Sequence, residues 1–204
     1  MKRFAMLMVA LGTSLTLAAC GSNDSTTGAS PSTASTSAST SASEHNPADV
    51  TFAQGMIPHH RQALMMAEMA ADRASMPEVK DLASRIKAAQ DPEIQTMSGW
   101  LKSWGEDVPA DGSMGMGGGQ RSSSMPMAGM MTNDEMSELM GMGGSAFDRM
   151  FLTSMTEHHE GAIEMAKTEQ AQGSYLPAKE LAAKIAQDQQ AEITEMADLL
   201  AKIN

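Results

Sequence analysis

The chain has 204 residues, of which 22 are methionine and only 3% are aromatic. After a leader and a linker, this length leaves room for one domain of ordinary size. A core with so few rings must be built from Ala, Leu, Ile and Met, which favour helices over strands. The formal net charge of −11 at pH 7 argues against a nucleic-acid-binding protein and for a surface that attracts cations.

The first 19 residues have the pattern of a bacterial signal peptide. Two basic residues precede an apolar run from Phe4 to Ala19, which is too short and too closely followed by polar residues for a membrane span. The sequence Leu-Ala-Ala-Cys ending at Cys20 matches the bacterial lipobox, in which cleavage precedes a lipidated cysteine. We therefore predict a leader over 1–19, lipidation of Cys20, and an extracytoplasmic location with a lipid anchor in the bacterial cell membrane.

Residues 20–45 continue from this cysteine as a segment composed almost wholly of Ser, Thr, Ala and Gly. Such a composition cannot form a core, so we predict a flexible tether. His45 lies at its end, where we expect it to be unstructured. Because Cys20 is the only cysteine, the folded part has no thiol, and a soft-metal site there must use thioethers and imidazoles.

A first helical hairpin is predicted over residues 46–105. Asn46 and Pro47 provide an N-cap and a proline at the first helical position, and apolar residues then follow helical spacing to about Ala74. Pro77 opens a second helix after a short break. Two helices joined by so short a connection form an antiparallel pair.

A Gly/Met-rich linker is predicted over 106–131, and a short helix with a second hairpin over 132–204. The linker contains Met-x-Met pairs that resemble the methionine-rich sequences of copper-handling proteins, although a mobile spacer without a ligand role is the slightly better explanation. The second hairpin is expected as one helix from about Ser145 to Ala171 and another from about Leu176 to Ile203.

The two hairpins contain an internal duplication. Residues 56–67 and 155–166 both read Met-x-x-His-His-x-x-Ala-x-x-Met-Ala, and matching positions continue without a gap into the second helix of each hairpin. A repeated helical unit usually packs against its own copy. We therefore predict an all-α fold in which two tandem αα-hairpins form a four-helix bundle.

The duplicated motif places His and Met side chains on one face of each helix. If the hairpins pack about a pseudo-twofold axis, four imidazoles and four thioethers converge. Thioether sulfur selects Cu(I) or Ag(I), and imidazole also suits Cu(II), whereas a zinc site more often contains Cys or a carboxylate. We predict copper, with Cu(I) favoured and Ag(I) as its surrogate, and the candidate ligands are Met56, His59, His60, Met66, Met155, His158, His159 and Met165.

Polar residues on the second helix of each hairpin are candidates for supporting the imidazoles. Their side chains are expected to accept hydrogen bonds from the ring N–H opposite the metal, unless they lie on a solvated face. They are Gln90, Glu93, Gln189 and Glu192.

A purely structural alternative remains open, in which the imidazoles are hydrogen-bonded core residues and the methionines are core filling. It explains poorly why four of the five histidines form two identical pairs. No nucleophile, base and orienting group stand together, so we expect a binding protein rather than an enzyme. The other functional alternatives are a metal-dependent oxidoreductase, a metal-free helical interaction module, and a buffer for zinc or other cations.

The doubled His-His-x-x-Ala-x-x-Met-Ala blocks, the Phe147-Asp148 pair and the Gln-x-x-Glu-Ile blocks resemble the domain of unknown function 305 family. The resemblance covers about Asn46 to Asn204. It implies a ferritin-like four-helix architecture in the bacterial envelope, copper binding in some members, and the eight candidate ligands as site positions. The expected function is copper sequestration or delivery, with no nucleic-acid partner and an unidentified copper-handling partner protein.

Overall fold

The computed structural model describes residues 44–110 and 127–203, and within these ranges it contains helices and no strands. The predicted leader, the lipidation site Cys20 and nearly all of the tether lie outside the described residues. The predicted all-α bundle is confirmed. Its helices are α1 (Pro47–Arg73), α2 (Pro77–Trp104), α3 (Asn133–Gly141), α4 (Gly144–Gln172) and α5 (Leu176–Leu200).

Local sequence signals explain where the helices begin and end. The side chain of Asn46 accepts hydrogen bonds from the N–H groups of Ala48 and Asp49 at 2.8 and 3.2 Å, and the carboxylate of Asp49 accepts the N–H of Asn46 at 2.5 Å. This reciprocal pair satisfies donors that the first turn of α1 leaves open. Pro77 opens α2, and Gly105 ends it in a left-handed conformation at φ 77° that suits glycine.

The turns of the two hairpins are capped across the bundle. Asp148 of α4 accepts the N–H groups of Ser75 and Met76, at 3.0 and 3.1 Å, where α2 begins. Asp49 of α1 accepts the N–H groups of Ser174 and Tyr175, at 3.1 and 3.0 Å, where α5 begins. Both aspartates occupy matching positions of the duplication, so the sequence repeat is also a structural repeat. Each hairpin therefore ties down the turn of the other.

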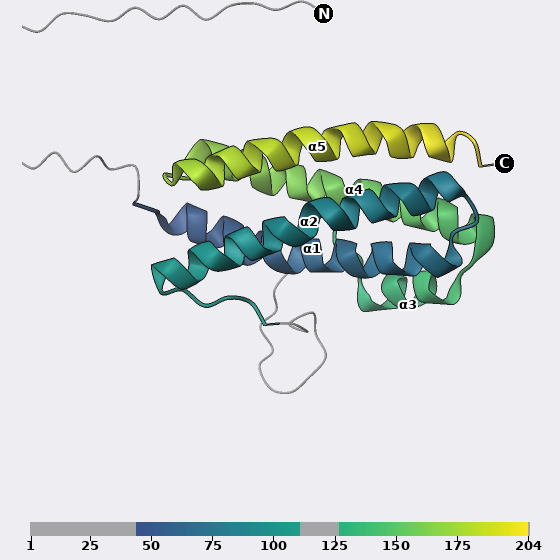
Figure 1. Cartoon of the computed structure of the whole chain (residues 1–204), viewed down its shortest axis with the longest axis horizontal. Coiled ribbons are helices and arrows are strands. Elements are labelled where there is room, and N and C mark those ends of the chain that lie inside the picture. Colours follow the sequence, from purple (N-terminus) through teal and green to yellow (C-terminus); the bar gives the residue numbers. More distant parts are fainter. Residues whose placement is uncertain (1–43, 111–126, 204) are drawn as a thin grey trace, which may run out of the picture. The chain divides into compact units, whose positions relative to one another are not determined.

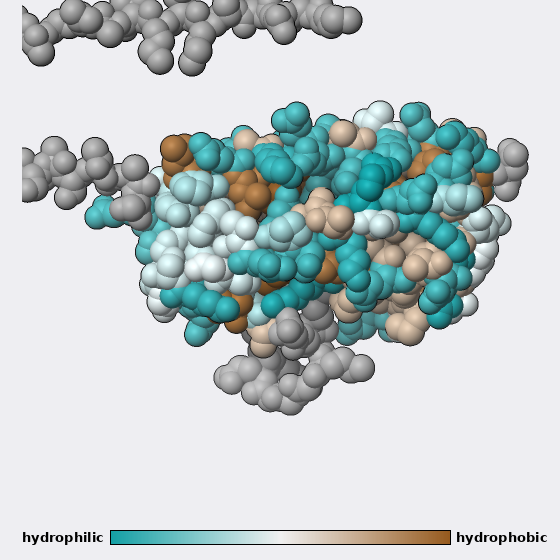
Figure 2. Space-filling view, viewed as in Figure 1, coloured by the Kyte–Doolittle hydropathy of each residue, from teal (hydrophilic) through white to brown (hydrophobic). Residues whose placement is uncertain are grey.

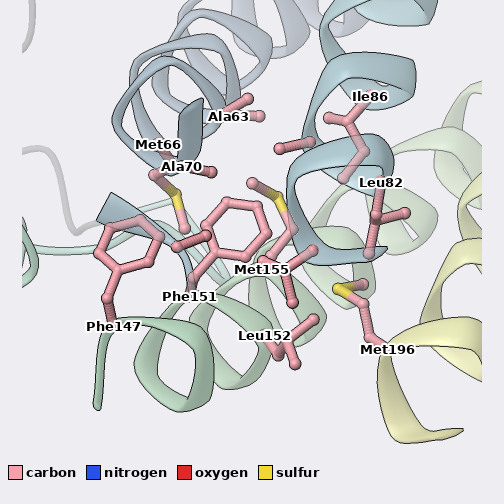
Figure 3. Packing of buried hydrophobic residues seen from close by; sticks show 14 of the residues in the cluster. Ala63, Met66, Ala70, Leu82, Ile86, Phe147, Phe151, Leu152, Met155 and Met196 are labelled. Atoms are coloured by element: carbon pink, nitrogen blue, oxygen red, sulfur yellow. The ribbon is translucent and has the colours of Figure 1, made fainter. Parts of the chain in front are cut away.

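The hairpins α1–α2 and α4–α5 pack together mainly through α1 and α4, while α2 and α5 touch less closely and the short α3 lies against α4 (Figure 1). Phe147 and Phe151 stack with ring centroids 5.8 Å apart inside one apolar cluster. Figure 3 shows Met66, Met155 and Met196 pointing into this cluster beside Phe151. The two helices that carry the histidine pairs are thus the central, mutually facing helices.

The visible face of the bundle is largely hydrophilic, with small apolar areas between polar side chains (Figure 2). The exposed large apolar side chains among the described residues are Met65, Met140 and Leu176. A search of the described helices for a stretch long and apolar enough to cross a membrane finds none.

Candidate metal centre

The four paired histidines meet in the interior, where α1 and α4 face each other. His59 and His60 of α1, and His158 and His159 of α4, are all fully buried. The ring centroids of His59 and His158 are 3.8 Å apart, with a tilt of 39° between the ring planes, and those of His158 and His159 are 6.3 Å apart. The duplication therefore brings equivalent rings into direct contact.

Two of the rings are held by carboxylates from the second helix of their own hairpin. The ring N–H of His60 donates from Nε2 to Glu93 at 2.9 Å, and that of His159 donates from Nε2 to Glu192 at 2.7 Å. An ionised carboxylate only accepts hydrogen bonds, so the proton of each neutral ring must be on Nε2. Both carboxylates were candidate supporting residues, and both contact the expected imidazoles.

The other two rings donate to backbone carbonyls. Nε2 of His158 donates to the carbonyl of His59 at 2.9 Å, and Nε2 of His59 donates to the carbonyl of Ala128 at 3.3 Å. A carbonyl also only accepts, which again places the proton on Nε2. Whenever one of these rings is neutral, its lone pair is therefore on Nδ1.

The Nδ1 atoms have no hydrogen-bond partner among the described residues, although all four are buried. A buried polar atom without a partner costs about 1 to 3 kcal/mol. Each of these atoms lies on a ring whose opposite nitrogen already donates a hydrogen bond, so its lone pair is available to a metal ion. This donor set fits a metal ion that accepts neutral nitrogen ligands.

Burial keeps three of these imidazoles neutral. It is the main cause that lowers the pKa of His59 from 6.5 to about 3, with a further contribution from the neighbouring His60. Burial likewise lowers the pKa of His60 and, together with His59, lowers that of His158 well below its usual value. At neutral pH the lone pairs of these three rings are therefore available to a metal rather than occupied by protons.

A short segment at the end of the linker, residues 127–131, lies over this interior, and we call it the strap. The side chain of Gln62 donates to the carbonyl of Met131 and accepts its N–H, both at 2.8 Å. A Cβ at Gly161 would overlap the carbonyl oxygen of Ala128, so glycine is required there. Gln62 and Gly161 are duplicate positions, which makes the two half-sites inequivalent. The strap also differs from the mobile linker expected over 106–131, most of which lies outside the described residues.

The candidate methionines do not converge with the four rings. Met66 and Met155 belong to one core cluster, Met56 belongs to another, and Met165 lies half-buried in a surface hollow. The predicted common pocket of four thioethers is therefore wrong. Its physical reason is that a core with so few aromatic residues uses methionine to fill its volume.

The two glutamines expected to support the rings do not do so. Gln90 and Gln189 are buried, but neither amide has a hydrogen-bond partner in the part of the chain that the structure describes. In the same ranges, no three His, Cys, Asp or Glu side chains come close enough to hold one metal ion. Among these residues, neither a cage of charged ligands nor a set of three imidazoles around one point is therefore formed, and the donors present are pairs of imidazoles.

His45 differs from its expected unstructured state. Its ring stacks on Trp104 with centroids 4.4 Å apart and planes 7° from parallel. Trp104 also packs against Tyr175 at the start of α5, edge to face at 5.3 Å. The flat indole surface accounts for the order of this residue, which lies at the end of the bundle and apart from the metal centre.

Sequence reasoning missed a carboxyl pair beside the second turn. Glu169 is buried next to Asp49, and burial, a hydrogen bond to Asp49 and its negative charge raise the pKa of Glu169 to about 8. With a pKa of about 8, Glu169 is mainly protonated at neutral pH. Burial alone would raise the pKa of Asp49. The interaction with Glu169 and hydrogen bonds from several backbone N–H groups outweigh burial, so the pKa of Asp49 is lowered. The duplicate of Glu169 is Ala70, so the repeat carried no signal for it.

We expect Glu169→Gln to abolish a loss of stability between pH 6.5 and pH 8. A carboxyl whose pKa rises from 4.5 to about 8 on folding stabilises the fold fully below pH 4.5 and loses this contribution by about pH 8. The buried histidines act in the opposite direction, and each is still about half protonated at pH 6.5 in the unfolded chain. His59 and the two others with lowered pKa values therefore regain together about 1 kcal/mol of stability by pH 8. Glu169 itself lowers the free energy of unfolding by about 1 to 2 kcal/mol over this range, so wild type should lose a little stability whereas Glu169→Gln should gain some.

Urea unfolding of the metal-free chain at pH 6.5 and pH 8 measures this difference. Glu160→Gln, which changes an exposed carboxylate on the same helix, should leave the wild-type decrease intact. An equal decrease in wild type and Glu169→Gln would contradict the assignment.

A helical bundle of two duplicated hairpins, with paired and buried imidazoles on its central helices, defines the class of this protein. The chain belongs to the family described as domain of unknown function (DUF305), whose model matches residues 49–200. The resemblance seen in the sequence is therefore confirmed. No curated protein sequence matches the chain.

Solved structures agree with this membership. A DUF305 protein from Streptomyces coelicolor, described as secreted, is 35% identical, with a TM-score of 0.66 over 76% of this chain and 91% of that one. CopM in its Cu(II)-bound form is 33% identical, with a TM-score of 0.62 over 75% of this chain and 95% of CopM. CopM in its Cu(I)-bound form is 32% identical, with a TM-score of 0.59 over 74% and 94%.

Proposed function

We propose that this chain is an extracytoplasmic copper-binding protein that holds Cu(I) on its buried histidine pairs. The observation that carries this proposal is the set of four buried Nδ1 lone pairs, each on a ring that already donates from Nε2. The rings present neutral donors without a charged cage. Imidazole suits copper among several metals, and the similar protein CopM, solved with Cu(I), Cu(II) and Ag, supports the choice of copper.

The proposed role is sequestration or delivery rather than turnover. The carboxylates of Glu93, which is buried, and Glu192, which is partly buried, both accept ring N–H groups, which orients the imidazoles and strengthens them as ligands. Within the proposal, the lipobox at Cys20 anchors the protein outside the cytoplasm, and the secreted relative supports that compartment.

An anaerobic titration of the full chain with Cu(I) against a competing chelator tests the proposal. Proton–nitrogen NMR of the rings is recorded in parallel. The expected result is stoichiometric uptake, with shifts at the Nδ1 resonances of the buried rings and little change at Nε2. Thermal unfolding should shift upward, because an ion that binds only the folded chain stabilises it.

The alternatives give different results in the same experiment. A metal-free interaction module shows no thermal shift with Cu(I) or Ag(I). A zinc or general cation buffer is stabilised by Zn²⁺ as strongly as by Cu(I). Ring resonances that do not respond to Cu(I) would exclude the histidine pairs as its ligands.

A further inference from the structure

A surface hollow of about 440 Å³ opens beside the first half of α1, close to the histidine pairs. Its lining includes Phe52, Gly55, Met127, Met165, Thr168 and Glu169. Two of these residues carry thioethers from separate segments, since Met127 begins the strap and Met165 lies on α4. Neither is fully buried.

The two sulfur atoms approach the same point above Gly55. They lie 3.5 Å (Met165) and 3.8 Å (Met127) from the position that a Cβ on Gly55 would take. Because Gly55 has no side chain, the space between the sulfurs and the helix is left open. Thioethers so placed can bind one soft ion from two sides.

Met165 is less buried than its duplicate, because it packs partly against an apolar core cluster and partly lines the hollow. Its counterpart Met66 is fully buried within the main apolar cluster, whereas Met165 faces the hollow. The same α4 face carries His158 two turns earlier, about 10 Å along the helix axis. Met127 is adjacent to Ala128, whose carbonyl accepts the ring N–H of His59. Both thioethers are therefore close in the chain to residues of the histidine interior.

The strap holds Met127 in place. Gln62 grips Met131 through two hydrogen bonds of 2.8 Å, and Gly161 admits the backbone at Ala128. A thioether on a free linker would lose conformational entropy on binding an ion, but one on a pinned segment has already lost most of it. The hollow is thus preorganised for two-sulfur binding.

We propose that Met127 and Met165 form an outer site for a soft monovalent cation, Cu(I) or Ag(I), separate from the histidine pairs. This inference rests on the proposed function, because it assigns a second site for the same ion. The outer site captures the ion at the surface, near the strap that covers the imidazoles. Neutral thioethers select soft ions over Zn²⁺ or Mg²⁺.

Protection from oxidation tests the site, with Ag(I) as the probe. A thioether whose lone pair is bound to Ag(I) resists conversion to sulfoxide by hydrogen peroxide. Peptide mass spectrometry of the full chain should show oxidation of Met127 and Met165 slowed by roughly tenfold with Ag(I). Met140, which is 53% exposed, serves as the internal control and should oxidise at the same rate with and without the ion.

Matched variants test whether protection of each thioether requires the other. Met165→Leu should remove the protection of Met127, and Met127→Leu that of Met165, whereas Met140→Leu should change neither. Gly55→Leu fills the space between the sulfurs while keeping both thioethers, and it should abolish protection at both. Equal oxidation rates with and without Ag(I), or undiminished protection of Met127 in Met165→Leu, would overturn the outer site.

Different variants test the outer site and the histidine centre independently. In the double variant Met127→Leu with Met165→Leu, the ring resonances should still respond to Cu(I). In a chain whose four buried histidines are changed to Gln, the two thioethers should still be protected by Ag(I). Loss of thioether protection in that chain, with its helical circular dichroism intact, would show that the outer site is not independent. Absence of the ring response in wild type would instead count against the proposed function alone.

Discussion

A chain in which all four paired histidines are changed to glutamine will retain its fold and lose Cu(I) binding at the bundle interior. The amide nitrogen of Gln can replace Nε2 of His as a donor to Glu93, Glu192 and the backbone carbonyls. It has no atom equivalent to Nδ1, so the four lone pairs disappear while the supporting hydrogen bonds remain. We expect the affinity to fall by roughly a thousandfold or more, equivalent to about 4 kcal/mol. The four histidines changed to glutamine in this variant are His59, His60, His158 and His159.

The measurement is the anaerobic chelator competition, made on wild type, the four-glutamine chain and Met65→Leu. Met65 is 42% exposed on the same helix as the first histidine pair, so its replacement measures how much an exposed thioether outside the interior contributes to Cu(I) binding. Circular dichroism of each chain establishes that the helices are present. Equal Cu(I) affinity in wild type and the four-glutamine chain, after correction for the outer thioethers, would eliminate the histidine centre.

The unpartnered Nδ1 atoms lower the stability of the metal-free chain. Each leaves about 1 to 3 kcal/mol of stability unrealised in the metal-free chain, and the rest of the bundle must offset this. A bound ion recovers that loss, so binding and folding are linked. In the metal-free fold, apolar packing elsewhere in the bundle offsets this loss and so keeps the empty site folded.

Much of this arrangement follows from the duplication. Because Glu93 and Glu192 stand at the same offset from their histidines, the sequence predicts that they act alike, and the hydrogen bonds of 2.9 and 2.7 Å show that they do. Asp49 and Asp148 also match and also act alike. Where both copies carry the same residue, periodicity and symmetry together determine its surroundings.

The features that could not be predicted are those in which the copies differ. Gln62 hydrogen bonds to the strap while its counterpart Gly161 makes room for it. Neither residue type reveals from the sequence that its partner lies in the distant strap. The methionines present the same difficulty, since Met66 fills the core and Met165 faces a hollow. Helical spacing places a side chain on a face, but only tertiary packing determines what that face meets.

Replacement of Asp148 by alanine will cause the largest loss of stability among single substitutions at the turns. Its buried carboxylate accepts the backbone N–H groups of Ser75 and Met76 at 3.0 and 3.1 Å, and also the hydroxyl of Ser75. Alanine leaves these donors unsatisfied at the start of α2. Hydrogen bonds to charged groups contribute about 1.5 to 3 kcal/mol each, so we expect a loss of about 3 to 5 kcal/mol.

Urea unfolding of the metal-free chain at pH 7 measures this loss, with the exposed Asp198→Ala as the matched control. Asp49→Ala should also destabilise, because it removes the same cap from the second turn. The two caps stand at opposite ends of α1, about 35 Å apart at 1.5 Å per residue, so their effects should add within about 0.5 kcal/mol in the double variant. A loss below about 1 kcal/mol for Asp148→Ala, where several kcal/mol are expected, would mean that the turn does not depend on the other hairpin. Addition of the two losses would instead show that each hairpin is fastened to the other at two independent points, which keeps α1 and α4 in the register that pairs His59 with His158.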